Sequence, residues 1–137
     1  MTTAGYSGTP LAKKLGIKPG GVVLTLAAPS EYRAWLEPMP DGVRFVAKAP
    51  REGCDLVHLF VPTLAVLTRD LPKARAAMKP DAALWVSWYK KAAKIPTDVT
   101  EDEIRRLALR GDLVDVKVCA VTEIWSGLKL VIRKHLP

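Results

Sequence analysis

Three nearly continuous apolar runs of strand length alternate with segments of helical pattern, and this alternation constrains the fold more than any other feature. The runs lie at residues 22–26, 55–61 and 82–88. A strand that is apolar at consecutive positions is buried on both faces, which is typical of a parallel sheet covered by helices on both sides. The alternation therefore predicts an α/β fold in three layers with an open, mostly parallel sheet.

Helical patterns fill the connections, at residues 10–15, 30–36, 63–79 and 100–110. We expect Thr9 to cap the first helix and Gly16 to end it. Pro72 lies inside the third pattern, where it predicts a kink or two short helices. The fourth pattern opens with Thr-Glu-Asp-Glu, a capping box that marks the beginning of a helix.

Weaker strand patterns lie at residues 43–47, 114–120 and 128–132 and bring the sheet to about six strands. The last two alternate apolar and polar residues and flank a short loop, which predicts an antiparallel hairpin. With strands numbered along the chain, the predicted order is 2-1-3-4-6-5, with the last strand antiparallel. The connection at 48–54 is short for a parallel crossover, so a frayed, antiparallel or tucked-in second strand stays open.

The length of the sequence limits the number of domains, and its charge limits the class of partner. The 137 residues fit a single domain over 1–137, with residues 1–8 as a flexible tail. The net charge of +7 favours anionic partners, although the positive residues are dispersed, as is usual for a solvated surface. No apolar run approaches the ~20 residues of a membrane helix and no signal peptide is visible, so we expect a cytoplasmic protein without a membrane partner.

The chemically reactive side chains are few and scattered. We interpret Cys54 and Cys119 as reduced thiols, and we predict neither a metal site nor a catalytic residue. His58 lies in the middle of a buried run, where a histidine is expected to hydrogen-bond within the core rather than act as a base.

Four segments, LAKKLGIKPGGVVLTL, CDLVHLFV, LPKARAAMKPDAALWVSW and LVDVKVCAVTEIWSGLKLVIRK, together resemble a shortened class I S-adenosylmethionine-dependent methyltransferase. The resemblance implies a Rossmann-like sheet closed by an antiparallel hairpin, with S-adenosylmethionine as cofactor. More closely, GYSGTPLAKKLGIKPG together with KVCAVTEIWSGLKLV is similar to a family of short, uncharacterised bacterial proteins, mostly actinobacterial. This second similarity covers nearly the whole chain and implies no activity.

Two departures from the methyltransferase pattern fall where the cofactor would bind. Ala27, Ala28 and Pro29 replace the glycines that let the backbone approach the cofactor. Ala47 and Lys48 replace the acidic residue that would hold the ribose hydroxyls. We interpret both changes as arguments against this cofactor and predict none, with S-adenosylmethionine kept as an alternative.

Ligands of open α/β sheets gather outside the carboxyl ends of the strands, and this rule selects the candidate binding residues. They are Ser30, Lys48, Ser87, Tyr89, Lys90, Lys91, Asp98 and Trp125. The stretch SWYKK joins a hydroxyl, two aromatic rings and two cations, and the long polar loop at 89–99 follows it. A solvated loop here and a simply packed Trp125 are the competing interpretations.

The sequence thus predicts a non-enzymatic binding or regulatory module for a small anionic ligand held near Lys48, Lys90 and Lys91. Three alternatives stay open. The first is an S-adenosylmethionine-dependent methyltransferase. The second is a nucleic-acid-binding protein that uses its basic charge and the stretch WYKKAAK. The third is an interaction subunit that dimerises through an edge strand, since the oligomeric state cannot be predicted.

Overall fold

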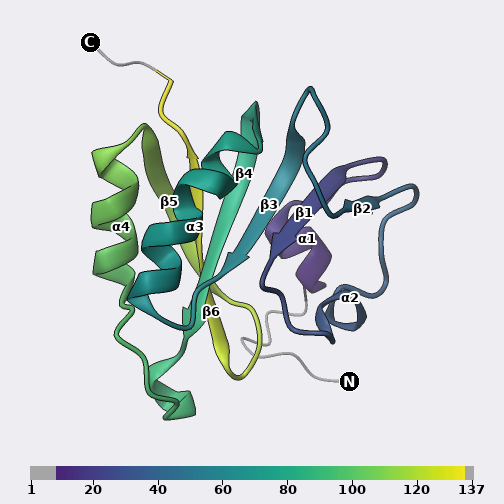
Figure 1. Ribbon diagram of the computed structural model, residues 1–137. Helices are drawn as coiled ribbons and strands as arrows, with labels where there is room; N and C mark the ends of the chain where they lie inside the picture. The colour runs from purple at the N-terminus through teal and green to yellow at the C-terminus, as the bar shows by residue number, and fades with distance from the viewer. Residues whose placement is uncertain (1–8, 135–137) are drawn as a thin grey trace.

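A computed structural model describes residues 9–134 as a six-stranded sheet between two helical layers (Figure 1). The strands are β1 (Val22–Leu26), β2 (Arg44–Val46), β3 (Cys54–Phe60), β4 (Met78–Tyr89), β5 (Leu113–Ala120) and β6 (Trp125–Ile132). The helices are α1 (Leu11–Leu15), α2 (Tyr32–Trp35), α3 (Leu64–Ala76), the short 3₁₀ turn η1 (Lys91–Ala93) and α4 (Glu101–Arg110). The tail predicted at residues 1–8 lies outside the described residues.

The strand order is β2-β1-β3-β4-β6-β5, as the sequence predicts. The first four strands in this order are parallel, and β6 pairs antiparallel with both β4 and β5. β2 is therefore parallel to β1, and the antiparallel alternative is excluded. Residues 47–53 carry the chain from β2 past β1 to β3 without a helix, which is why this connection is so short.

Helices cover both faces of the sheet, and each face has its own apolar core. α3 and α4 lie in front of the sheet in Figure 1, where Leu67 and Ile104 are buried against Leu59 and Leu84. α1 lies behind it with α2, and Leu15 and Leu36 are buried there with Phe60 and Trp85. The central strands therefore have almost no contact with water, as their continuous apolar runs predict.

β4 begins earlier than the sequence predicts, because the expected turn at Pro80 and Asp81 is an irregularity inside the strand. Cys54 pairs with Met78 and Leu56 with Ala83, so two steps along β3 match five along β4. Proline cannot donate a ladder hydrogen bond, and a bulge is one of the few places where a strand accepts it. The prediction of a strand beginning at Ala82 was therefore too short.

Three local predictions on helices and loops are also corrected. α3 runs through Pro72 as one helix rather than two short ones, because burial of Leu67, Leu71 and Ala74 outweighs the one hydrogen bond that the proline cannot donate. The N-cap of α1 is Pro10, without a capping side chain, rather than Thr9. The loop predicted at 89–99 contains the η1 turn, which ends at Lys94 in the left-handed region with φ 55°.

β5 forms one edge of the sheet and carries a bulge at its midpoint. Asp115 pairs with Leu130 and Lys117 with Lys129, so Val116 is an extra residue without a partner on β6. The side chains of Val116 and Val118 are about half exposed, at 51% and 45%. The edge is thus apolar but irregular.

The two glycines Gly53 and Gly16 share a left-handed backbone, with φ 92° and 86°, but differ in the space around them. A Cβ on Gly53 would lie 3.0 Å from the backbone nitrogen of Lys79, whereas a Cβ on Gly16 would meet nothing within 4 Å. We expect Gly16→Ala to lower the free energy of unfolding by about 1 kcal/mol and Gly53→Ala by roughly 2–4 kcal/mol. Urea denaturation measures both, and equal losses would contradict the packing described at Gly53.

Candidate functional site

The carboxyl ends of four parallel strands meet at one edge of the sheet, where ligands of open α/β sheets bind. The turns that follow β2, β1, β3 and β4 therefore line up along this edge, which we call the carboxyl edge. Lys48 follows β2 and Lys90 follows β4, so the two lysines lie at the same edge, but the strands they follow are separated by three strand spacings, about 14 Å.

The turn after β1 has an unusual backbone. Ala27 adopts φ 61°, one of two positive values among the non-glycine residues of 9–134. This conformation costs an alanine roughly 1 kcal/mol and is adopted freely by glycine. The turn therefore keeps a glycine-like conformation although its residue is alanine. Ala27 is exposed, and the adjoining Ala28 packs partly against the core behind the sheet.

Beyond the end of β4 the carboxyl edge opens into a pocket of about 780 Å³. It is lined by Trp88, Tyr89, Lys90, Lys91, Lys94, Ile95, Pro96, Thr97, Val99, Thr100, Glu101 and Asp102. Three predicted site residues, Tyr89, Lys90 and Lys91, thus share one cavity. The lining combines lysines of the η1 segment, carboxylates from the first turn of α4 and the buried apolar residues Trp88 and Val99.

The charges in this pocket are unevenly compensated. Glu101 and Asp102 both accept hydrogen bonds from Arg105, the second at 2.9 Å. The carboxylates of Glu101 and Asp115 raise the pKa of the arginine further. The three lysines of the lining form no ion pair with any residue of 9–134. The free charge in the pocket is therefore positive.

The other predicted site residues do not line this pocket, and all of them except Lys48 have a partner within the described residues. Asp98 accepts a hydrogen bond from the backbone nitrogen of Leu64 at 2.6 Å and so caps α3. Trp125 is buried and stacks on Tyr89, with ring centroids 4.3 Å apart. Ser30 is exposed after β1 and donates to the carboxylate of Glu31 at 3.1 Å.

Ser87 is fully buried and belongs to a hydrogen-bond chain across the sheet. The hydroxyl of Tyr32 lies 2.7 Å from Nδ1 of His58, and the Oγ of Ser87 lies 2.7 Å from Nε2. These hydrogen bonds join α2, β3 and β4, and the His58 ring also stacks on Phe60. The prediction that His58 hydrogen-bonds within the core is confirmed, and the buried hydroxyl of Ser87 is one of its two partners.

Burial keeps this hydrogen-bond chain neutral. It lowers the pKa of His58 to about 3 and raises that of Tyr32 above its usual range, because a charge on either ring would be without water. Burial also raises the pKa of Cys54 and Cys119, so neither thiol is activated as a nucleophile. No group of histidine, cysteine and carboxylate side chains within residues 9–134 is arranged to hold a metal ion.

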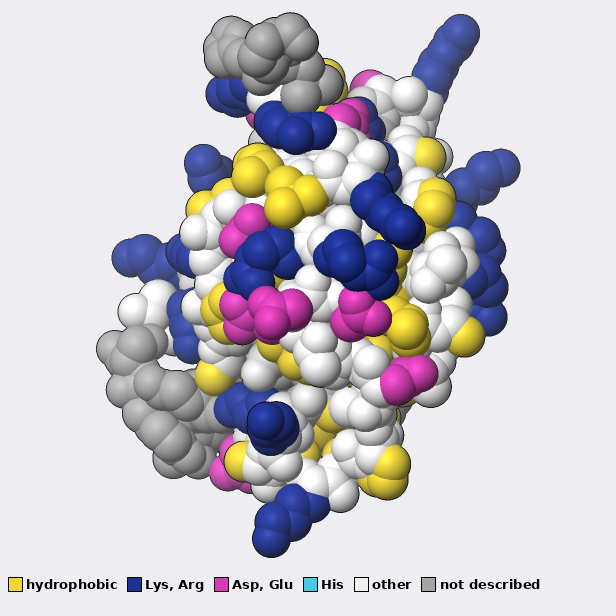
Figure 2. All heavy atoms as spheres, turned by 90° about the vertical axis from the view of Figure 1, so that its left-hand side faces the viewer, with side chains coloured by type: hydrophobic (Ala, Val, Ile, Leu, Met, Phe, Trp, Pro, Cys, Tyr) yellow, Lys and Arg dark blue, Asp and Glu magenta, His cyan; other side chains and the backbone are white. Residues whose placement is uncertain are grey.

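The outer side of α4 and β5 carries both signs of charge. Figure 2 shows Lys and Arg side chains next to Asp and Glu on this side. Arg75 pairs with Asp112 at 2.8 Å, and Arg106 pairs with Glu103 at 2.8 Å. A uniform basic face for nucleic acid is therefore absent from this side of the described structure.

Sequence reasoning missed the residues that complete the pocket and the hydrogen-bond chain. Lys94, Glu101 and Asp102 join the pocket because η1 folds the loop back toward the first turn of α4. The lysine-rich composition of the loop was the one feature of the sequence that could have indicated Lys94 as part of the pocket. Nothing in the sequence marks Tyr32 as the partner of His58, since the two are 26 positions apart.

Solved structures of similar fold identify this architecture. A methyltransferase from Aquifex aeolicus, described as dependent on S-adenosylmethionine, superposes with a TM-score of 0.63 at 15% identity and covers 89% of this chain and 87% of its own. A putative type 11 methyltransferase from Sulfolobus solfataricus gives 0.62 at 13% identity, with 91% and 90% covered. The fold is that of class I methyltransferases.

A third similar structure of this methyltransferase fold contains ligands. It is the 1,6-didemethyltoxoflavin-N1-methyltransferase of Burkholderia thailandensis with bound 1,6-didemethyltoxoflavin and S-adenosylhomocysteine, at a TM-score of 0.55 and 16% identity, with 90% of this chain and 75% of that chain covered. No protein-family model and no curated protein matches the chain, so the closer similarity to a short bacterial family stays a prediction.

These neighbours overturn the function predicted from the sequence. They favour a methyltransferase over a non-enzymatic binding module for an anionic ligand, and that prediction is wrong. The physical reason is that the turn after β1 adopts a left-handed backbone without glycine, since Ala27 has φ 61°. Within residues 9–134, no helix is long and apolar enough to cross a bilayer.

The neutral histidine makes stability depend on pH. His58 binds a proton near pH 6.5 when unfolded but only near pH 3 when folded, so the free energy of unfolding falls as the pH falls through this window. We expect a loss of about 2 kcal/mol between pH 7 and 5, where carboxylates contribute little. Denaturation at both pH values measures it, and His58→Gln should remove most of the slope. An unchanged slope in the variant would assign the effect to other groups.

The hydroxyl of Tyr32 should matter for folding where that of Tyr89 does not. Tyr32→Phe leaves His58 without one buried hydrogen bond, and we expect the free energy of unfolding to fall by about 1–3 kcal/mol. Tyr89→Phe is the matched control, because Tyr89 is only partly buried and its hydroxyl forms no hydrogen bond within residues 9–134, so we expect almost no change. Chemical denaturation of both variants decides, and equal losses would contradict the role of the hydrogen-bond chain.

Proposed function

We propose that this protein is a cytoplasmic S-adenosylmethionine-dependent methyltransferase that holds its cofactor at the carboxyl edge, over the turn after β1. The observation that carries the proposal is the left-handed Ala27 at the end of β1, in a sheet with the methyltransferase strand order. A costly backbone conformation at a ligand-binding edge is a recurrent mark of functional sites.

The residues at this turn fit an adenosyl cofactor in size and polarity. Ala27 is exposed and carries the smallest side chain after glycine, so a ligand can approach the backbone closely. Ser30 and Glu31 follow it at the start of α2, and both are exposed. A carboxylate accepts hydrogen bonds from ribose hydroxyls, and Glu31 offers one although Lys48 occupies the end of β2.

The hydrogen-bond chain supports this turn from below. Tyr32 follows Glu31 directly, and its hydroxyl is fixed to His58 in the central strand. α2 has only four residues and could not hold its position by backbone hydrogen bonds alone. The contact between Tyr32 and β3 therefore sets the distance between the turn and the sheet.

The pocket beyond β4 is suited to hold the methyl acceptor. The cofactor, when bound, supplies an electrophilic methyl group on a sulfonium centre. Within the described lining of the pocket there is no histidine, and both carboxylates are bonded to Arg105. Since no strong general base is at hand, the acceptor atom should be nucleophilic without one, as an amine nitrogen or an ionised oxygen is. Tyr89 and the lysines would orient it.

Titration with S-adenosylhomocysteine tests the cofactor site through a pair of variants at Ala27. Glycine and asparagine both tolerate the left-handed conformation, so neither should disturb the fold. We expect Ala27→Gly to bind S-adenosylhomocysteine at least as tightly as the wild type, because the backbone becomes more accessible. We expect Ala27→Asn to bind roughly tenfold more weakly, because its side chain lies where the ligand approaches. Calorimetry measures all three affinities.

Absence of binding at millimolar ligand, in a wild type that unfolds cooperatively, would rule out the cofactor. Binding with identical affinity in all three proteins would show that the cofactor lies elsewhere than over the β1 turn. Ser126 lies on β6, away from this turn, and Ser126→Asn serves as a control for an unrelated added side chain. We expect it to bind like the wild type.

A further inference from the structure

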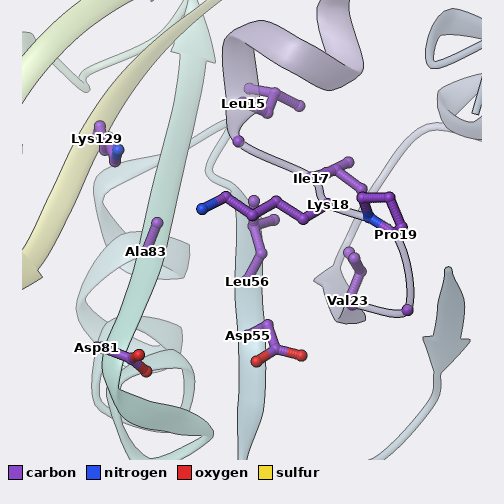
Figure 3. A pocket seen from close by; sticks show the side chains of 13 residues that line it. Leu15, Ile17, Lys18, Pro19, Val23, Asp55, Leu56, Asp81, Ala83 and Lys129 are labelled. Carbon is purple, nitrogen blue, oxygen red and sulfur yellow. The ribbon is translucent and has the colours of Figure 1, made fainter. Parts of the chain in front are cut away.

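A second pocket lies at the opposite edge of the sheet, where the parallel strands begin. Its volume is about 420 Å³, within the range of small-molecule sites. Figure 3 shows it between the segment after α1 and the first residues of β1, β3 and β4. We call this cavity the amino-edge pocket. The carboxyl edge lies at the other end of the same strands, so the two sites share no residue.

The amino-edge pocket exists because small residues leave part of the sheet uncovered. α1 ends at Leu15, and the segment after it contains Gly16, Gly20 and Gly21, whose backbone forms one wall. The floor is formed by Leu56 and Ala83 from the sheet. The pocket thus combines an apolar floor with walls rich in backbone atoms, which suits a small molecule better than a protein surface.

Two lysines enter this pocket without a carboxylate partner. The side chain of Lys18 runs across the pocket toward Ala83 and Lys129 in Figure 3. Lys129 projects from β6 and is only partly exposed. Neither lysine forms an ion pair with another described residue. Lys117 lies directly opposite Lys129 on β5, a like-charge neighbour that is unfavourable unless an anion lies between the ammonium groups.

The acidic side chains of the pocket lie at its other end. In Figure 3 the carboxylates of Asp55 and Asp81 are set apart from the ammonium groups of Lys18 and Lys129. Asp55 is satisfied, since it accepts from the backbone nitrogen of Val22 and from Lys79, each at 2.8 Å. Asp81 is exposed and has no such hydrogen bonds within residues 9–134. The carboxylate of Asp81 is therefore free to accept a hydrogen bond from a ligand.

We propose that the amino-edge pocket binds a small phosphorylated molecule that also carries hydroxyl groups, such as a sugar phosphate. The phosphate would bind between Lys18 and Lys129, with the charge of Lys117 beside it. The carbon skeleton would lie on Leu56 and Ala83, and a hydroxyl would donate to Asp81. The site does not depend on the proposed methyltransferase function.

Calorimetric titration with ribose 5-phosphate tests this site, with ribose as the probe that lacks the phosphate. We expect the wild type to bind ribose 5-phosphate and not ribose. Lys18→Gln and Lys129→Gln should each weaken binding roughly tenfold or more, the usual effect of losing a charge-assisted hydrogen bond. Lys73→Gln is the matched control, because Lys73 is an exposed lysine on α3, outside the amino-edge pocket. It should bind like the wild type.

The position of the ligand is read from backbone amide shifts in NMR spectra. Ribose 5-phosphate should shift the amides of Gly16, Gly20 and Gly21 and leave that of Ala27 in place, whereas S-adenosylhomocysteine should do the reverse. The two sites can therefore fail separately. Equal affinity of the wild type, Lys18→Gln and Lys73→Gln would overturn the proposal, as would no binding at millimolar ribose 5-phosphate. If the protein bound a short single-stranded oligonucleotide but did not bind ribose 5-phosphate, the proposal would be overturned in favour of nucleic acid.

Asp81→Asn tests the hydroxyl end of the site against inorganic pyrophosphate, which has no carbon-bound hydroxyl group. We expect the variant to lose affinity for ribose 5-phosphate several-fold relative to pyrophosphate, because an amide accepts a hydrogen bond less strongly than a carboxylate. An equal gain for both probes would mean that Asp81 only repels anions, and the hydroxyl assignment would then be wrong. Thermal unfolding of each variant verifies that the fold is intact.

Discussion

The central strand β3 is hydrogen-bonded on both sides and covered on both faces, so any polar side chain on it must find its partner inside the protein. His58 meets this demand with Tyr32 and Ser87. One of these partners positions the short helix after the β1 turn, and the other lies two residues before Tyr89 in the wall of the large pocket. The interior of the sheet thus determines the shape of the carboxyl edge.

The two edges of the sheet differ in how they are built. The longer loops lie at the carboxyl edge, and side chains of η1 and α4 line the cavity there. At the amino edge the turns are tight and rich in glycine, and the cavity is defined mainly by backbone and by small residues. Uncompensated lysines are common to both. The same sheet therefore offers two cavities with uncompensated lysines, one of about 780 Å³ and one of about 420 Å³.

The sequence predicted the architecture well and the site only in part. Continuous apolar runs reveal buried parallel strands, because burial on both faces leaves no room for polar alternation, and the strand order follows from crossover rules. Pro72 and the Pro80–Asp81 pair misled because tertiary packing and a strand irregularity absorbed them. The turn after β1 adopts a left-handed backbone without glycine, since a backbone conformation is not determined by residue type alone.

The carboxyl-edge site was predicted through Tyr89, Lys90 and Lys91, which are close in sequence and remain close in space. Asp98 and Ser87 already have partners in a helix cap and in the core, which a sequence does not show. Contacts between distant positions, such as that of Tyr32 with His58, leave no periodic signal. The limit of prediction here is the pairing of polar groups rather than the placement of strands.

The irregular outer strand bears on how copies of this chain meet one another. A regular edge strand can form backbone hydrogen bonds with a strand of a second molecule, and the half-exposed valines of β5 would add apolar contact to such a pair. The unmatched residue at Val116 breaks the spacing of free amide and carbonyl groups that such a neighbour would need. The edge strand is therefore apolar, but its backbone does not present the regular row of hydrogen-bonding groups from which aggregates grow.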